Sequence, residues 1–208
     1  MLLAPLFEMN PLDDNTVQAA LEALSSLLAD AGAETQGPVI CGGAALILSG
    51  LRSRTTKDID VVAMINQADE LVSPAPLPES LVNAASKVAR LLNLPADWIN
   101  NGPSSNEGGI YQLGLPSGFQ SRLTAVEIGS HLTLYLIDRI DQIFFKLYAA
   151  AGQGSGRHYD DLLHLNPSVD ELQAAAEWTR THDPSEGFQI VLRALFTYMG
   201  HDELATRI

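Results

Sequence analysis

The segment from Val39 to Ala63, VICGGAALILSGLRSRTTKDIDVVA, constrains this chain more than any other part of it. An apolar strand is predicted to end at Gly42-Gly43, and after a short helix a second apolar strand begins with Asp58 and Asp60. Side chains alternate between the two faces of a strand, so these two carboxylates point the same way. Two like charges beside an apolar strand are costly unless they share a cation or a proton. The segment therefore predicts a metal-dependent site that handles phosphate.

The residues around the two aspartates bear on the same prediction. The glycine pair supplies backbone that can approach a bulky anion closely. Arg52, Arg54 and Lys57 lie within six residues, and no Lys or Arg precedes Arg52 in the chain. These cations could receive the phosphates of a small nucleotide, or they could simply balance Asp58 and Asp60. Both interpretations stay open at this point.

Composition and charge exclude several other classes of protein. The chain has 208 residues, of which 46% are hydrophobic, and a formal net charge of −13. This composition is typical of a soluble globular protein, and the negative charge argues against extended DNA binding, which depends on Lys and Arg. The one cysteine, Cys41, permits no disulfide within the chain, and no apolar run is long enough to span a membrane. We therefore expect a cytoplasmic protein that does not bind membranes.

Hydrophobic periodicity and turn signals predict an α/β (α+β) order of elements. Strands are expected at 39–41 and 58–65 and in a hairpin within 122–137, and helices at 14–31, 44–51, 79–94, 138–151, 157–165, 168–180 and from 184 onward. Residues 97–118 are predicted to be irregular, and His201-Asp202 a turn or tail. The pattern predicts an α/β domain over 1–137 and a helical domain over 138–208, with a hinge near 152–156.

Helix caps can also be predicted from the sequence. Asp14, Asn15 or Thr16 is expected to cap the first helix. Ser168 with Glu171 forms the pattern of a capping box.

Two motifs resemble those of a known family. The pattern GG-x-A followed by G-L-x-x-R-x-T-x-D-I-D-V looks like the signature of the nucleotidyltransferase fold, here Gly42, Gly43, Ala45, Gly50, Leu51, Arg54, Thr56, Asp58, Ile59, Asp60 and Val61. The closer likeness is to bacterial minimal nucleotidyltransferase-like proteins of unknown role, related to the AbiEii-type toxins of toxin–antitoxin systems. The downstream segment DQIFFKLYAAAGQGSGRHYDDLLHL is similar to that group's pattern and places Lys146, Arg157 and Asp161 at its downstream positions. The resemblance covers roughly residues 39–172.

The resemblance implies a fold, a reaction and a set of site residues. The fold is a small mixed sheet with helices, followed by a C-terminal helical bundle. In the two-metal mechanism of the family, Asp58 and Asp60 would hold Mg²⁺, which bridges the nucleotide phosphates and activates the attacking hydroxyl. The nucleoside triphosphate would contact the remaining expected residues, which are Gly42, Gly43, Arg54, Thr56, Lys57, Lys146 and Arg157. Either Arg54 or Lys57 would offset charge on the leaving pyrophosphate.

The resemblance also implies a third carboxylate. Active members bring it from the strand beside the D-x-D strand, and Glu127 is the only acidic residue in the candidate hairpin. We expect Glu127 as the third catalytic and metal-binding carboxylate, provided that it faces Asp58 and Asp60. If it faces away, the site has two carboxylates and could bind nucleotide or metal without turnover.

Three hypotheses about function stay open. The first is an enzyme that moves a nucleotidyl group from a nucleoside triphosphate to a hydroxyl on a protein, an RNA or a small molecule. The second is a non-catalytic module of the same fold, such as one half of a toxin–antitoxin or other protein pair. In the third, Asp58 and Asp60 are structural and pair with the nearby arginines and lysine.

A zinc site is a further alternative from the sequence. Asp160 and His164 share a helix face at a spacing of four, with His158 nearby, but no second cluster of ligands is evident. The spacing favours a solvated helix face with an Asp-His pair over a zinc site.

Overall fold

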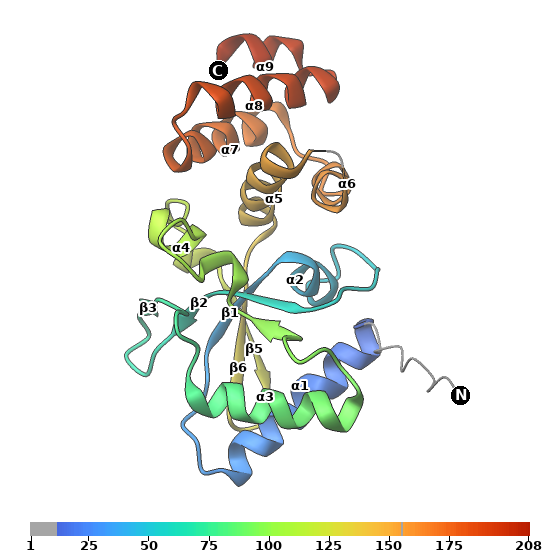
Figure 1. Ribbon diagram of the computed structural model, residues 1–208, viewed down its shortest axis with the longest axis vertical. Coiled ribbons are helices and arrows are strands. Elements are labelled where there is room, and N and C mark those ends of the chain that lie inside the picture. Colours follow the sequence, from blue (N-terminus) through green and yellow to red (C-terminus); the bar gives the residue numbers. More distant parts are fainter. Residues whose placement is uncertain (1–11, 155) are drawn as a thin grey trace, which may run out of the picture.

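The two apolar strands of the central segment lie side by side in one mixed sheet (Figure 1). The computed structural model describes residues 12–154 and 156–208. In it β1 (Pro38–Cys41) pairs antiparallel with β2 (Ile59–Ile65), and β6 (Leu132–Leu136) pairs parallel with β1. The outer strand on that side is β5 (Thr124–Ile128). The order of the sheet is thus β3-β2-β1-β6-β5.

Two short strands share the other edge of β2. The strand β3 (Leu71–Val72) pairs antiparallel with the far end of β2, and β4 (Ile99–Asn100) pairs parallel with its beginning. The hairpin of β5 and β6 was predicted and is confirmed. The strand β4 was not predicted, because residues 97–118 are rich in Asn, Gly and Ser.

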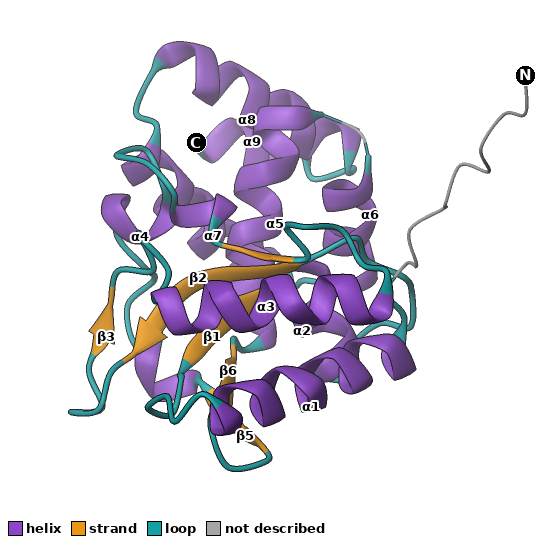
Figure 2. Ribbon diagram, turned by 60° about the horizontal axis from the view of Figure 1, so that its bottom comes forward, coloured by secondary structure: helices purple, strands orange, loops and turns teal. Residues whose placement is uncertain are grey.

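Helices α1 (Asp14–Asp30) and α3 (Glu79–Leu92) run side by side across one face of the sheet (Figure 2). Their apolar stripes pack on strand residues of that face, among them Ile40, Ile59 and Val61. The opposite face carries Val39 and Val62 and is covered by other apolar side chains, which include Phe119 and Phe145. Both faces of the central strands are therefore buried, as their continuous apolar sequence predicts.

From Arg139 onward the described chain is helical, and this part, called the helical half below, lies at the end of the molecule opposite α1 and α3 (Figure 1). It consists of α5 (Arg139–Gln153), α6 (Arg157–His164), α7 (Val169–His182), α8 (Glu186–Tyr198) and α9 (Asp202–Arg207). These helices share an apolar core, which Leu46 of α2 (Gly42–Leu48) also joins. Three shorter helical turns complete the description: η1 (Gly102–Ser104), α4 (Ile110–Leu113) and η2 (Gln120–Arg122).

Local hydrogen bonds fix several helix starts. The capping box of α7 is confirmed, since Ser168 Oγ accepts from Glu171 N at 3.2 Å and Glu171 Oε2 accepts from Ser168 N at 2.8 Å. The first helix is capped by Asp13, which accepts from Thr16 N at 2.8 Å, so the expected caps lie one to three residues too late.

Two other boundaries differ from expectation. Helix α2 begins at Gly42, two residues earlier than predicted, and His201-Asp202 opens α9 where a turn or tail was expected. The expected hinge at 152–156 contains Ser155, which lies outside the described residues.

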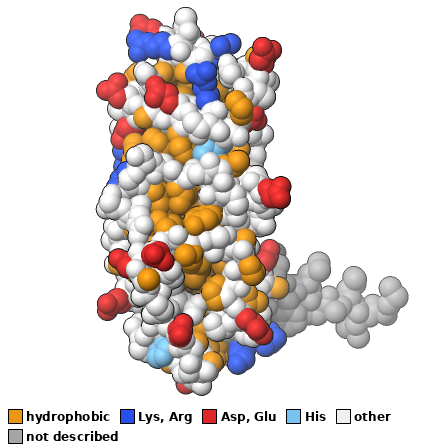
Figure 3. Space-filling model, turned by 90° about the vertical axis from the view of Figure 1, so that its left-hand side faces the viewer, with side chains coloured by type: hydrophobic (Ala, Val, Ile, Leu, Met, Phe, Trp, Pro, Cys, Tyr) orange, Lys and Arg blue, Asp and Glu red, His pale blue; other side chains and the backbone are white. Residues whose placement is uncertain are grey.

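Acidic side chains outnumber basic ones in this chain, whose formal net charge is −13. Figure 3 shows one face on which hydrophobic side chains gather between acidic side chains, while basic side chains stand mainly near its two ends. Within residues 12–154 and 156–208, no helix has the length and apolar character that crossing a membrane requires.

Candidate functional site

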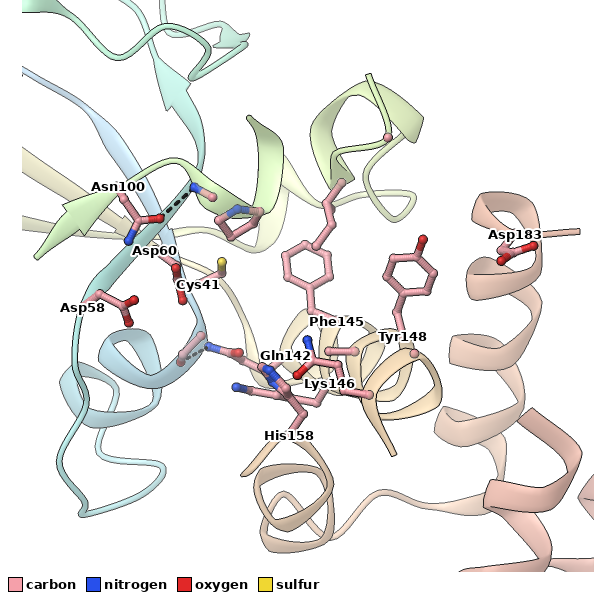
Figure 4. Close-up of a pocket in the computed structure, with 18 of the residues that line it drawn as sticks. Cys41, Asp58, Asp60, Asn100, Gln142, Phe145, Lys146, Tyr148, His158 and Asp183 are labelled. Atoms are coloured by element: carbon pink, nitrogen blue, oxygen red, sulfur yellow. Dashed lines mark hydrogen bonds between the residues drawn. The ribbon is translucent and has the colours of Figure 1, made fainter. Parts of the chain in front are cut away.

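Asp60 lies on the face of β2 that turns toward α5, and Asp58 directly precedes this strand. Their neighbours Ile59 and Val61 are fully buried in the core under α1 and α3, so alternation places both carboxylates on the opposite side. Both aspartates line a cavity of about 670 Å³ between the sheet and the helical half, together with Gly42 and Lys146 (Figure 4). This volume is in the range of small-molecule sites.

Gly42 brings the backbone of α2 against Asp60. Its φ of +71° is in the left-handed region, and a Cβ built on it would lie 2.6 Å from Asp60 Oδ2. A side chain at this position would displace the carboxylate. The space that a Cβ on Gly43 would need is occupied by the guanidinium of Arg54 and by Thr56 Oγ1, 2.7 Å away. Gly42 therefore makes room for the carboxylate of Asp60, and Gly43 for the guanidinium of Arg54 and the hydroxyl of Thr56.

The two carboxylates are crowded and partly dehydrated. Burial and the charge of Asp58 raise the pKa of Asp60 to about 6, against the lowering effects of Lys146 and a hydrogen bond from Asn100. Burial and the charge of the nearby Asp97 raise the pKa of Asp58. Because both shifts disfavour the charged forms, a cation placed between these carboxylates would relieve a repulsion that already exists.

The two arginines of the motif, Arg52 and Arg54, form ion pairs with Asp161 of α6 and not with Asp58 or Asp60. Arg52 Nη1 pairs with Asp161 Oδ1, while Asp161 Oδ2 lies 3.2 Å from Arg54 Nη2 and 2.8 Å from Lys146 Nζ. The contacts at Oδ2 are ion pairs by distance without an aligned hydrogen bond. The side chain of Asp161 is completely buried. In the described part of the chain, no Lys or Arg forms an ion pair with Asp58 or Asp60.

The cluster around Asp161 leaves a net positive charge beside the cavity. One carboxylate cannot neutralise two guanidinium groups and one ammonium group. The side chain of Lys146 is 4% exposed, and its residue lines the cavity and lowers the pKa of Asp60. The arginines therefore do not neutralise Asp58 and Asp60 through direct ion pairs, as one interpretation of the sequence proposed.

Two expected nucleotide-binding cations lie at the rim. Lys57 and Arg157 are both exposed, and neither lines the cavity. Their charges nevertheless act on Asp58, whose pKa each of them lowers. Thr56 is buried and its Oγ1 donates to the carbonyl oxygen of Asp58 at 3.3 Å, so it shapes the start of β2.

Glu127 does not meet the aspartates, and this corrects the expectation of a third ligand. It lies on β5, three strands from β2, which is about 14 Å across a sheet. Its partner Thr133 stands three residues before Leu136, the residue that pairs with Ile40 near the cavity end of β1. Glu127 is thus also about 10 Å down the strand, and its exposed side chain does not line the cavity.

Sequence reasoning missed several residues of the cavity wall. Asn100 pairs with Asp60 in the β2–β4 register, at the strand edge where a third carboxylate was expected. Gln142 and His158 reach the cavity from α5 and α6. Gln142 could have been predicted from the sequence, because it lies four residues before Lys146 and therefore on the same helix face.

The donor set suits a hard divalent cation. Asp58 and Asp60 offer carboxylate oxygens, which Mg²⁺ prefers, and Mg²⁺ commonly takes its other ligands from water and substrate phosphate. The described residues include no group of three or more His, Cys, Asp or Glu side chains placed to hold a metal alone. The site fits Mg²⁺ that arrives with a phosphate ligand.

The zinc alternative finds no support in the described residues. His164 contacts the carbonyl oxygen of Leu51 through Nε2 at 3.1 Å, Asp160 is exposed, and His158 turns to the cavity. These three side chains therefore do not converge on a common position where a zinc ion could bind.

We predict that Gly42→Ala destabilises the protein more than Gly50→Ala does. Both glycines have φ near +65° to +71°, but only Gly42 has an atom within 4 Å of the added Cβ. The control should lose about 1 kcal/mol from backbone strain, and Gly42→Ala at least about 1 kcal/mol more because Asp60 must move. Urea unfolding measures both, and equal losses would contradict the close approach of Asp60.

We predict that Asp161→Asn costs about 3 kcal/mol or more of unfolding free energy. The substitution leaves three cations around a buried site without their counter-charge. Asp160→Asn is the matched control, because Asp160 is exposed on the same helix and should change stability by less than about 0.5 kcal/mol. Similar stability of the two variants in urea unfolding would refute the central role of Asp161.

Comparison with known proteins agrees with this geometry. A family model described as "Nucleotidyltransferase of unknown function (DUF6036)" matches residues 17–155, more than half of the chain. Comparisons with curated proteins and with solved structures give no match. The matched range contains β1, the glycine pair, both aspartates and Lys146. The chain therefore belongs to this family of nucleotidyltransferases of unknown function.

Proposed function

We propose that this protein is a magnesium-dependent enzyme that transfers a nucleotidyl group from a nucleoside triphosphate to a hydroxyl group. The observation that carries the proposal is the pair Asp58 and Asp60, which share one cavity and form no ion pair with a described Lys or Arg. An unpaired, crowded pair of carboxylates beside Lys146 is suited to a metal and the phosphates that the metal carries.

The residues of the cavity would have distinct roles in such a transfer. Mg²⁺, when bound, supplies electrophilic stabilisation of the phosphates. Asp58 and Asp60 hold the metal, and Lys146 places positive charge where the phosphates lie. In the transfer, the acceptor oxygen bonds to the α-phosphorus, the bond from that phosphorus to the bridging oxygen breaks, pyrophosphate leaves, and the proton of the acceptor hydroxyl passes to solvent.

The backbone at Gly42 and Gly43 adds a second contact for phosphate in this proposal. Gly42 and Gly43 lie in the first turn of α2, directly after Cys41, the β1 residue that pairs with Asp60. The exposed Arg157 and Lys57 at the rim would attract the nucleotide before it is bound.

A second candidate function follows from the position of Glu127. With Glu127 three strands away, Asn100 occupies the neighbouring strand position and supplies an amide in place of a carboxylate. This arrangement favours a module that binds nucleotide and Mg²⁺ without turnover, for example as one partner of a toxin–antitoxin pair. Turnover separates the two candidates, because both require nucleotide binding at Asp58 and Asp60.

We predict that Asp58→Asn lowers Mg²⁺-dependent affinity for nucleoside triphosphates at least about tenfold, because it removes one of two charged metal ligands. Isothermal titration with each nucleoside triphosphate, with and without Mg²⁺, measures this loss. Transfer of labelled nucleotide to protein, RNA and small-molecule hydroxyls measures catalysis.

Glu127→Gln is the matched control for this experiment. It removes an exposed carboxylate from the same sheet and should leave Mg²⁺-dependent binding unchanged. Unchanged affinity of Asp58→Asn would overturn the proposed metal site, whereas tight binding without transfer to any acceptor would favour the non-catalytic module.

A further inference from the structure

Gln142 carries a buried amide oxygen that the protein itself does not satisfy. The residue lies on α5 and is fully buried. Its Nε2 donates to the carbonyl oxygen of Gly42 at 3.4 Å, and its Oε1 has no hydrogen-bond partner among the described residues. Most buried polar groups are hydrogen-bonded, because an unpaired one forfeits its hydration. The free acceptor therefore calls for a partner from outside the chain.

The orientation of this amide follows from its neighbour. A carbonyl oxygen can only accept, so the NH₂ group of Gln142 must face Gly42. The oxygen is then directed away from Gly42, and Gln142 is one of the residues that line the cavity. Gln142 thus holds a buried, unpaired acceptor in a residue of the cavity wall, and a hydroxyl or N–H donor of a bound ligand could satisfy it.

Another polar atom of the wall makes a weaker case. His158 Nδ1 is also buried without a partner, but the residue as a whole is half-buried. Rotation of the His158 ring would bring Nδ1 to solvent, where water can be its hydrogen-bond partner. Gln142 is held at Gly42 by its own hydrogen bond and has no such freedom.

Gln142 stands between two chemically different parts of the cavity. Figure 4 shows Asp58 and Asp60 on one side of it and Tyr148 and Asp183 on the other. Beyond Gln142 the wall is mainly apolar and includes Phe145, Tyr148, Phe188, Ile110 and Ala149. The Tyr148 ring is packed against Phe188, with ring centroids 5.7 Å apart, so this part of the wall is fixed.

We propose that Gln142 Oε1 accepts a hydrogen bond from a sugar hydroxyl of a ribonucleoside triphosphate, whose base lies in the apolar part of the cavity. This inference rests on the proposed function, which places the phosphates at Asp58 and Asp60. The sugar is the next group along a nucleotide from its phosphates, and its hydroxyls are the donors that a lone acceptor requires. The base then meets the rings of Phe145 and Tyr148, which offer an aromatic surface to any base.

The test compares ligands that differ by a single hydroxyl. A ribonucleoside triphosphate, its 2′-deoxy and 3′-deoxy analogues and inorganic triphosphate are each titrated with Mg²⁺ into the full chain by calorimetry. We expect the ribonucleotide to bind about tenfold tighter than at least one deoxy analogue, the effect of one net hydrogen bond. In Gln142→Met, which keeps the volume but lacks the acceptor, all three nucleotides should bind alike.

Inorganic triphosphate separates this inference from the function on which it rests. Its affinity should be the same in the wild type and in Gln142→Met, because it reaches only the metal end of the cavity. Gln18→Met is the control substitution, since Gln18 is an exposed glutamine on α1, and it should keep the discrimination between nucleotides.

The possible outcomes test the sugar contact and the proposed function separately. If triphosphate binds with Mg²⁺ and the wild type makes no distinction among the nucleotides, the sugar contact is refuted while the proposed function stands. Absence of Mg²⁺-dependent binding by triphosphate and nucleotides alike would overturn both. The comparison within the wild type needs no variant, so it remains decisive even if Gln142→Met fails to fold.

Discussion

The buried carboxylate of Asp161 joins parts of the chain that are far apart in sequence. It comes from α6, while its cationic partners come from the loop before β2 and from α5. Removal of these charges from water is costly, and only their mutual contact offsets the cost. The ion cluster therefore fixes the loop of Arg52 and Arg54 against the helical half, and with it the start of β2. The position of Asp58 and Asp60 depends on this arrangement.

The same cluster decides how charge is distributed around the cavity. Because Arg52 and Arg54 are engaged by Asp161, they do not neutralise Asp58 and Asp60. The cavity thus keeps two crowded carboxylates and, next to them, the ammonium group of Lys146. This separation of charges is a property of the whole fold, since Asp161 follows Arg52 by 109 residues. A site with charges of both signs can hold a cation and a phosphate together.

The sequence predicts those features that depend on local patterns. The apolar runs gave β1 and β2, the spacing of Asp58 and Asp60 gave their common face, and Ser168 with Glu171 gave a helix start. Glu127 was misplaced because a hairpin pattern fixes the pairing of β5 with β6 but not the place of the hairpin in the sheet. Asn100 was missed because a strand of two residues leaves no periodic signal. The partner of Lys146 required a contact between α5 and α6 that only packing supplies.

The glycines of the central motif are in direct contact with two of its charged residues, Asp60 and Arg54. Gly42 leaves room for the carboxylate of Asp60, and Gly43 leaves room for the guanidinium of Arg54 and the hydroxyl of Thr56. Both glycines lie in the first turn of α2, directly after the strand that pairs with Asp60. A negative and a positive group thereby reach the same short stretch of backbone from the loop and strand that follow. A larger side chain at Gly42 would displace the carboxylate of Asp60, and one at Gly43 would displace the guanidinium of Arg54, so the glycine pair has an electrostatic function as well as a conformational one.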